Sequence, residues 1–333
     1  MTRRAWAAFV AVSVIWGLPY FFIRIALADL SPVFIAWSRL VLGAAILLPL
    51  AWRSGALRGL RSHLLALAAF AAADMAVPYV LISVGERFVA SSLAAILIAA
   101  VPLMVALLAI RFAPDERHSA LRLVGLFVGL GGVVVLLGLD VGGRPLELLG
   151  AACALLAAVC YAIGPLIVKR KLSTVDPLGA VTVSLVLGAA ALAAPAMFSA
   201  PRSIPPASTL AAVAVLGVVC TAIGMFLYFF LIAEAGPSRA TIITYLSPAV
   251  AVSLGVVFLG ERVGAVVVAG LLLILAGSWL STGGRTPPGP ATVWRHVAAP
   301  VRRVRARADL NSSRSSGPAF RQDQGAPQPR SAG

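Results

Sequence analysis

Residues 64–85 read LLALAAFAAADMAVPYVLISVG, a run of 22 residues in which Asp74, near the middle, is the one charged side chain. A helix needs about 17–25 mainly apolar residues to cross the hydrocarbon core of a bilayer. A carboxylate at mid-span costs on the order of 2.5–3.5 kcal/mol on insertion scales. The stretch therefore predicts a transmembrane helix that holds a buried acid, and the acid calls for a structural or functional explanation.

The composition extends this interpretation to most of the chain. Of its 333 residues, 60% are hydrophobic and 12% are charged, and the mean hydropathy is +0.98. A soluble domain carries about 25% charged residues. Similar uncharged runs recur, and we predict an all-α integral membrane protein with ten transmembrane helices. The expected spans are 5–23, 31–51, 64–84, 88–110, 121–139, 148–168, 177–199, 209–232, 240–259 and 263–281. The first run could also be read as a signal peptide, but it is longer than a signal-peptide core.

The distribution of positive charge predicts the orientation. With ten spans and the N-terminus inside, the cytoplasmic segments hold 21 of the 27 Lys and Arg residues, and the outer segments hold five. Without the C-terminal tail the division is still 12 to five. This asymmetry is the one that the positive-inside rule describes. We therefore expect a multi-pass protein of the plasma membrane with both termini in the cytoplasm.

An internal repeat appears when the sequence is shifted by 145 residues. The shift superposes unusual positions in order along both halves: Trp16 on Tyr161, Arg24 on Lys169, Pro32 on Pro177, Gly43 on Gly188, Glu116-Arg117 on Glu261-Arg262, and Gly125 and Gly132 on Gly270 and Gly277. Two units of five helices must have opposite orientations, because five is odd. The sequence thus predicts an inverted 5+5 repeat, the architecture of many secondary transporters. The units are residues 1–141 and 142–283, followed by a tail at 284–333.

Several motifs along both halves resemble one family. They are WGLPYFFIRIAL at 16–27, Pro32 and Arg39, a proline in the fourth span, a Glu-Arg pair before a glycine-spaced fifth span, and YLSPAVAVSLGVVFLGERV at 245–263. This pattern resembles the drug/metabolite transporter superfamily, and more narrowly its ten-helix members with two EamA-like domains. The resemblance covers residues 5–281. It implies transport, and many relatives export amino acids, other metabolites or drugs.

Asp74 and Arg39 are the leading candidates for a transport site. We expect them at similar depths on adjacent antiparallel helices, about 3 Å apart along the bilayer normal, given a rise of 1.5 Å per residue. In one interpretation, Asp74 faces a water-filled cavity and binds a proton or a substrate amine, while Arg39 tunes its pKa or contacts a carboxylate. In the other, the two side chains form a permanent ion pair that joins two helices.

Aromatic residues and prolines within the spans complete the candidate site. Trp16, Tyr79, Tyr161 and Tyr245 are expected to line the cavity, whereas Tyr228 and Tyr20 are expected at the bilayer interface. Prolines in the spans interrupt backbone hydrogen bonds and are expected to mark helix irregularities. These prolines are Pro78, Pro102, Pro165 and Pro248. The spacing Gly125-x-x-x-Gly129 indicates close packing within the chain rather than a dimer interface.

The sequence favours a secondary transporter, with an exporter of small amphipathic metabolites as the first hypothesis and protons as the coupling ion. It contains no Gly-x-x-x-x-Gly-Lys-Ser/Thr phosphate loop, and no cluster of residues suited to a metal or other cofactor. We therefore expect neither catalysis nor a cofactor. The alternatives are a membrane enzyme for lipid-soluble substrates and a scaffold or sensor without transport activity. The sequence indicates no oligomeric state.

The tail is rich in Pro, Ser and Arg, and we expect it to be largely disordered. In VWRHVAAPVRRVRARADL, at 293–310, valines recur on one helical face among arginines. This segment fits a helix lying on anionic lipids, although a solvated basic tail is an equal alternative. It contains no recognised nucleic-acid-binding module, so we expect no nucleic-acid partner.

Overall fold

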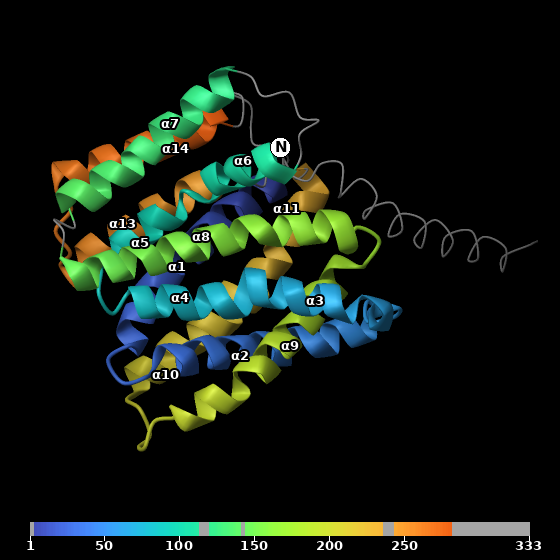
Figure 1. Cartoon of the computed structure of the whole chain (residues 1–333). Helices are drawn as coiled ribbons and strands as arrows, with labels where there is room; N and C mark the ends of the chain where they lie inside the picture. The colour runs from blue at the N-terminus through green and yellow to red at the C-terminus, as the bar shows by residue number, and fades with distance from the viewer. Residues whose placement is uncertain (1–2, 113–119, 141–143, 236–242, 282–333) are drawn as a thin grey trace, which may run out of the picture. The chain divides into compact units, whose positions relative to one another are not determined.

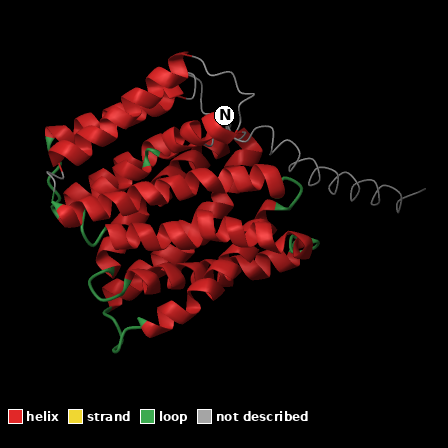
Figure 2. Ribbon diagram, viewed as in Figure 1, coloured by secondary structure: helices red, strands yellow, loops and turns green. Residues whose placement is uncertain are grey.

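The computed structural model describes residues 3–112, 120–140, 144–235 and 243–281. Every regular element within these ranges is a helix, as Figures 1 and 2 show. The expectation of an all-helical chain is therefore confirmed for the described residues. The tail at 284–333 lies outside them, and so does the expected contact of its basic segment with lipid.

The first half of the described chain contains ten helical segments. They are α1 (Arg3–Ala26), α2 (Pro32–Arg53), the short 3₁₀ helix η1 (Leu60–His63), α3 (Leu64–Ala71), the π-helix η2 (Ala72–Ala76), α4 (Val77–Gly85), α5 (Ser91–Ile98), α6 (Val101–Phe112), α7 (Ala120–Val135) and the π-helix η3 (Leu136–Asp140). The segments α3, η2 and α4 follow one another directly and form one long helix that carries Asp74.

The second half repeats much of this order. Its segments are α8 (Pro145–Lys171), α9 (Pro177–Phe198), α10 (Ala207–Ala214), the π-helix η4 (Val215–Ile223), α11 (Gly224–Ala235), α13 (Ile243–Leu259) and α14 (Ala265–Ser281). Again a π-helix lies between two α-helical segments in the third long helix of the half.

Within the described ranges, seven helices are long and apolar enough to cross a membrane. They span Arg4–Ala26, Pro32–Arg53, Leu60–Gly85, Ser91–Leu108, Pro145–Lys171, Pro177–Phe198 and Ala207–Ile232. Three shorter apolar helices, Leu123–Gly138, Ile243–Leu259 and Ala265–Ser281, fall on the remaining expected ranges. The structure thus contains a helix at each range that the hydropathy pattern selected.

Two helices begin with the same local chemistry. Ser31 precedes Pro32 and accepts a hydrogen bond from the backbone N–H of Phe34 at 3.2 Å. Asp176 precedes Pro177 and accepts hydrogen bonds from the N–H groups of the second and third helical residues at 2.9 and 3.2 Å. A polar cap followed by proline fits a helix start, because proline has no N–H to leave unpaired. The sequence therefore sets the starts of α2 and α9 in the same way, 145 residues apart.

The π-helix η2 has a direct cause in the sequence. Pro78 follows it and has no backbone N–H, so the carbonyl of Asp74, four residues earlier, loses its usual helical partner. A π turn widens the helix and makes room for the proline ring, and such turns are often found at functional sites. Pro102 follows the break between α5 and α6, whereas α8 and α13 continue without interruption through Pro165 and Pro248. The hydrogen bonds lost at these last two prolines are accommodated within a continuous helix.

The most extensive helix contacts join α7 to α14, α2 to α9, α1 to α13 and α4 to α8. Figure 1 shows α7 and α14 lying side by side. Their backbones touch because glycines face glycines: a Cβ at Gly277 would overlap the backbone of Gly129 and of Gly125. The expected role of Gly125 and Gly129 in packing within the chain is therefore confirmed.

Candidate functional site

Arg39 lies about two turns into α2 and is buried, with 7% of its surface exposed. Its Nε donates a hydrogen bond to Thr221 Oγ1 at 2.8 Å, and its guanidinium carbon lies 3.8 Å from the centre of the Tyr79 ring. A cation over an aromatic ring is attracted by the negative face of that ring, and more strongly when water is excluded. Arg39 thus connects α2 to α4 and to η4 of the other half of the chain.

Thr221 is positioned by the π-helix in which it lies. Its hydroxyl donates to the carbonyl of Leu216, five residues earlier, at 2.9 Å. The hydroxyl oxygen is then oriented to accept from Arg39. Gly43 of α2 lets this segment approach, because a Cβ there would come within 2.8 Å of the Thr221 methyl group. Small residues of this kind permit close contact between membrane helices.

Asp74 is half-buried in η2, at the place where the long helix is widened. Its carboxylate packs against Gly164 of α8, where a Cβ would overlap the Asp74 Oδ1. Asp74 interacts electrostatically with the side chains of Tyr79, Tyr161 and Tyr228. The acid therefore lies within electrostatic range of phenol groups contributed by α4, α8 and α11.

Arg39 and Asp74 both reach the neighbourhood of Tyr79, but they are not joined. Among the described residues, no ion pair within 4.0 Å joins Arg39 to Asp74, and the surface pair of Arg144 with Glu147, at 2.7 Å, involves neither of them. Arg39 uses the Tyr79 ring and Thr221 as its partners instead. The structure does not contain the permanent Arg39–Asp74 pair that one interpretation of the sequence required.

The remaining candidate aromatic residues differ in how they are placed relative to Arg39, Tyr79 and Asp74. The Trp16 ring of α1 packs against Tyr228 with centroids 4.8 Å apart. Tyr161, at the repeat-equivalent position in α8, packs against two clusters of buried apolar side chains, one containing Ile82 and the other containing Tyr79. It also interacts electrostatically with Tyr79. Tyr245 is half-buried in the first turn of α13, a helix that packs on α1 and α5. Trp16 and Tyr161 are thus brought close to the polar group, through Tyr228 and Tyr79 respectively.

The interpretation of the sequence missed three residues of this region. Tyr228 packs against Trp16 and interacts with Asp74, and Tyr20 is 8% exposed, but neither tyrosine was expected in the site. Their expected position at the bilayer interface stays a prediction. Thr221 also received no role. The repeat offered a signal for it, because Thr221 is equivalent to Ala76, two residues after Asp74. Among the described residues, no three His, Cys, Asp or Glu side chains could together hold a metal ion.

These features define a multi-pass helical membrane protein with a polar group buried among its helices. The chain matches the EamA-like transporter family twice, over residues 4–138 and 148–283, and it belongs to that family.

Similar proteins agree with this assignment. The chain is 30% identical over 285 residues to the "Uncharacterized inner membrane transporter YedA" of Escherichia coli, with 82% of this chain and 91% of that protein covered. It is 26% identical to the "Uncharacterized transporter YvbV" of Bacillus subtilis over 79% of this chain and 86% of that protein. It is 28% identical to a "Probable terminal-alkyne amino-acid exporter" of Streptantibioticus cattleyicolor, over 82% and 94% respectively.

A crystal structure shares the fold. It aligns with a TM-score of 0.61 at 18% sequence identity and covers 86% of this chain and 98% of the solved chain. The family and the named relatives make this chain a membrane transporter in its general role.

Proposed function

We propose that this protein is a secondary transporter that moves small amphipathic metabolites out of the cell by alternating access. The observation that carries the proposal is the polar group around Tyr79, where Arg39 of the first half bonds to Thr221 of the second. A buried cation and a half-buried acid are each costly in a membrane, and such groups commonly mark substrate or ion pathways. The bond also joins two parts that an alternating mechanism would move relative to each other.

The proposed architecture is ten transmembrane helices arranged as an inverted 5+5 repeat. Helix contacts support it, because α2 packs on α9 and α7 packs on α14, and each pair joins elements that begin 145 residues apart. The π-helices support it as well. Shifted by 145 residues, η2 would cover 217–221, which lies inside η4 (Val215–Ile223). Two helices widened at equivalent places would give each half a matching irregularity around a shared site, as in other transporters.

In the proposed orientation, the protein lies in the plasma membrane with both termini in the cytoplasm. It rests on the excess of Lys and Arg in the segments that would then face the cytoplasm.

Amino acids are the first candidates for the substrate. The guanidinium of Arg39 binds Thr221 through Nε, and its two terminal nitrogens carry further N–H donors that suit a carboxylate. Asp74 suits a substrate ammonium group or a proton. A zwitterion would satisfy both groups, and the named exporter relative makes this class a sensible first choice.

Transport by vesicles tests the proposal. Purified protein is reconstituted into liposomes loaded with an amino-acid mixture, and exchange of each labelled amino acid is followed from pH 5.5 to 8. We expect saturable exchange for at least one member. Replacing Asp74 with asparagine should lower that exchange by about 10-fold or more and remove its pH dependence, because a lost charge-assisted contact is worth about 1.5–3 kcal/mol.

Glu147→Gln is the matched control. It removes an acid from the partly exposed pair with Arg144 and should leave exchange unchanged, because such surface pairs contribute little. Normal exchange by Asp74→Asn with an unaltered pH profile would exclude Asp74 as the coupling site. If no amino acid exchanges above empty liposomes, the proposal that amino acids are the substrates is wrong.

A further inference from the structure

Glu86 occupies an unusual environment at the end of α4. It caps the C-terminus of that helix through its N–H, which donates to the carbonyl of Ile82 at 2.9 Å. Its side chain is fully buried, with 0% of its surface exposed. Neither carboxyl oxygen has a hydrogen-bond partner in the described part of the chain. An ionised carboxylate in such a place would be strongly disfavoured.

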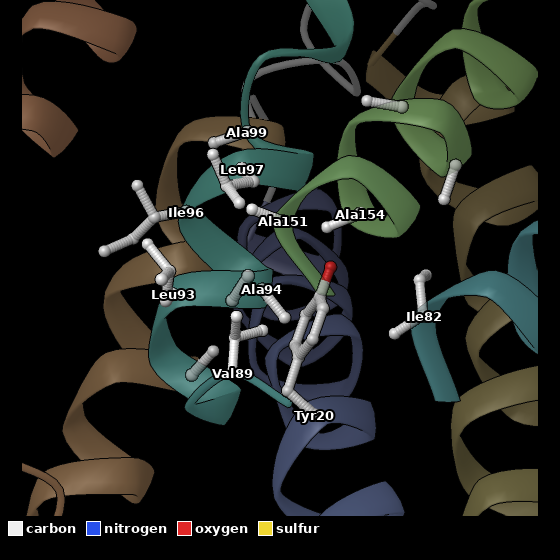
Figure 3. Close-up of a cluster of buried hydrophobic side chains, with 14 of the residues drawn as sticks. Tyr20, Ile82, Val89, Leu93, Ala94, Ile96, Leu97, Ala99, Ala151 and Ala154 are labelled. Carbon is white, nitrogen blue, oxygen red and sulfur yellow. The ribbon is translucent and has the colours of Figure 1, made fainter. Parts of the chain in front are cut away.

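Arg24 acts electrostatically on Glu86 but does not neutralise its carboxyl by a direct contact. The Arg24 guanidinium donates a hydrogen bond to the backbone carbonyl of Glu86, where it satisfies an unpaired group at the helix terminus. This use of Arg24 leaves the carboxyl oxygens without a donor. Figure 3 shows the apolar packing one turn earlier on α4, where Tyr20 stands between Ala94 of α5 and Ile82 with its hydroxyl end toward α8.

The carboxylate of a second acid, Glu261, has the hydrogen-bond donors that the Glu86 carboxyl lacks. Glu261 precedes α14, and its carboxylate caps the start of α5. It accepts from the N–H and the hydroxyl of Ser91, both at 2.8 Å, and from the N–H of Ser92 at 3.0 Å. Anions are favoured at helix N-termini, where N–H groups are unpaired. Burial raises the pKa of Glu261, but the hydrogen bonds from Ser91 and Ser92 outweigh it and hold the pKa below its usual value.

The surroundings of Glu86 push its own pKa upward. Burial is the largest cause, the charge of Arg24 acts against it, and the negative charge of Glu261 adds to it, so the pKa lies well above its usual value. Other elements packed against α4 also carry titratable or charged groups. They are Arg24 and Tyr20 of α1, Arg39 of α2 and Cys153 of α8. Glu261 and Arg87, the next residue in the chain, complete the set.

We propose that the Glu86 carboxyl is a proton-binding site, separate from Asp74, that is occupied in this conformation. Loss of that proton places a second negative charge beside Glu261 in a site without donors for it. Ionisation of Glu86 therefore destabilises this conformation and makes the protein respond to pH through the end of α4, independently of the substrate.

The pH dependence of stability tests the proposal on the purified full chain in detergent. In the unfolded chain a glutamate ionises near pH 4.3, while Glu86 in the folded chain stays neutral to higher pH. The unfolded state then binds fewer protons than the folded state, so Glu86 lowers stability as pH rises above that value. Glu86→Gln should match the wild type near pH 4.5 and unfold about 3 °C higher or more at pH 7.5, since 1 kcal/mol corresponds to about 2–4 °C.

Glu261→Gln is the control, and its effect on stability at pH 7.5 should have the opposite sign to that of Glu86→Gln. A carboxylate whose folded pKa is depressed stabilises above its unfolded pKa and loses this effect in acid. Glu261→Gln should therefore unfold at a lower temperature than wild type at pH 7.5, and the gap should close on acidification.

If Glu86→Gln instead unfolds lower than wild type at pH 7.5, or follows it in parallel at every pH, Glu86 is not a neutral acid and the proposal fails. If Glu86→Gln does not fold, Glu86→Met tests the same prediction, because an apolar side chain of similar volume suits an unpartnered neutral site. Infrared spectra at pH 7.5 add a direct measurement. The carbonyl band of a neutral carboxylic acid should be weaker in the folded variant than in the wild type, and an unchanged band would overturn the proposal.

Discussion

Replacing Gly277 with leucine is expected to prevent the folding of this protein, whereas the same change at Gly131 is expected to leave it folded. A Cβ at Gly277 would overlap the backbone N and Cα of Gly129 and come within 2.6 Å of the Gly125 carbonyl oxygen. Backbone atoms cannot move aside as a flexible side chain can, so α14 would have to separate from α7. Overpacking of a well-packed site typically costs about 1–3 kcal/mol, and more where the backbone must shift.

Gly131 lies in α7, and a Cβ there meets nothing within 4 Å. Leucine is favoured over glycine in a helix by up to about 1 kcal/mol, so Gly131→Leu is expected to be neutral or stabilising. Both variants are measured by the yield of monodisperse protein after detergent extraction and by the thermal unfolding of that protein. We expect little or no monodisperse protein for Gly277→Leu, and Gly277→Ala should melt below the wild type. Wild-type yield and melting for Gly277→Leu would show that α7 and α14 do not touch at this point.

The positions of the helices could be predicted from the sequence because lipid imposes a simple requirement. Each span needs a long apolar run, and such runs are visible without tertiary information. The close contact at Gly125 was also predictable, because two small residues one turn apart permit backbones to approach. These features depend on short stretches of chain and on the solvent around them.

The partners of Arg39 could not be predicted in the same way. Depth along the helix placed Arg39 level with Asp74, and opposite charges at one depth suggested a pair. The structure places Tyr79 and Thr221 against Arg39 instead. Which side chain meets the guanidinium depends on the rotation of each helix about its axis, and the widened turns η2 and η4 change that rotation. Pro78 predicted a helix irregularity near Asp74, but η4 contains no proline, so its sequence carried no such local signal.

For the same reason, the burial of Glu86 could not be predicted from the sequence. A glutamate next to an arginine at the end of an apolar run is typical of a charged pair at the bilayer interface. In the structure, the side chain of Glu86 is fully buried, and Arg24 binds the backbone beside it. Sequence position alone does not distinguish these cases, because burial at a helix end depends on the elements that cover it.

Arg39→Met is expected to leave the protein folded and to reduce transport about 10- to 100-fold, the loss that corresponds to one hydrogen bond with a charged group. The variant loses the bond to Thr221 and the contact with the Tyr79 ring. It also removes a buried cation that has no ion-pair partner in the described part of the chain, and whose desolvation is costly. These effects oppose each other in stability, so we expect the melting temperature to stay near that of the wild type or to rise.

A purely structural role for Arg39 gives a different pattern, and two further variants separate the alternatives. Arg39→Lys keeps the charge but loses the Nε donor and the planar group over Tyr79, so we expect its transport to remain impaired. Thr221→Val leaves the guanidinium in place but removes the acceptor that orients it, so its transport should fall between the wild type and Arg39→Met. Exchange in liposomes and thermal unfolding are measured on the same preparations. A large loss of stability together with normal exchange per folded molecule would mean that Arg39 fastens helices together and takes no part in transport. A loss of exchange at unchanged stability would mean that the membrane protein keeps this costly cation for its substrate.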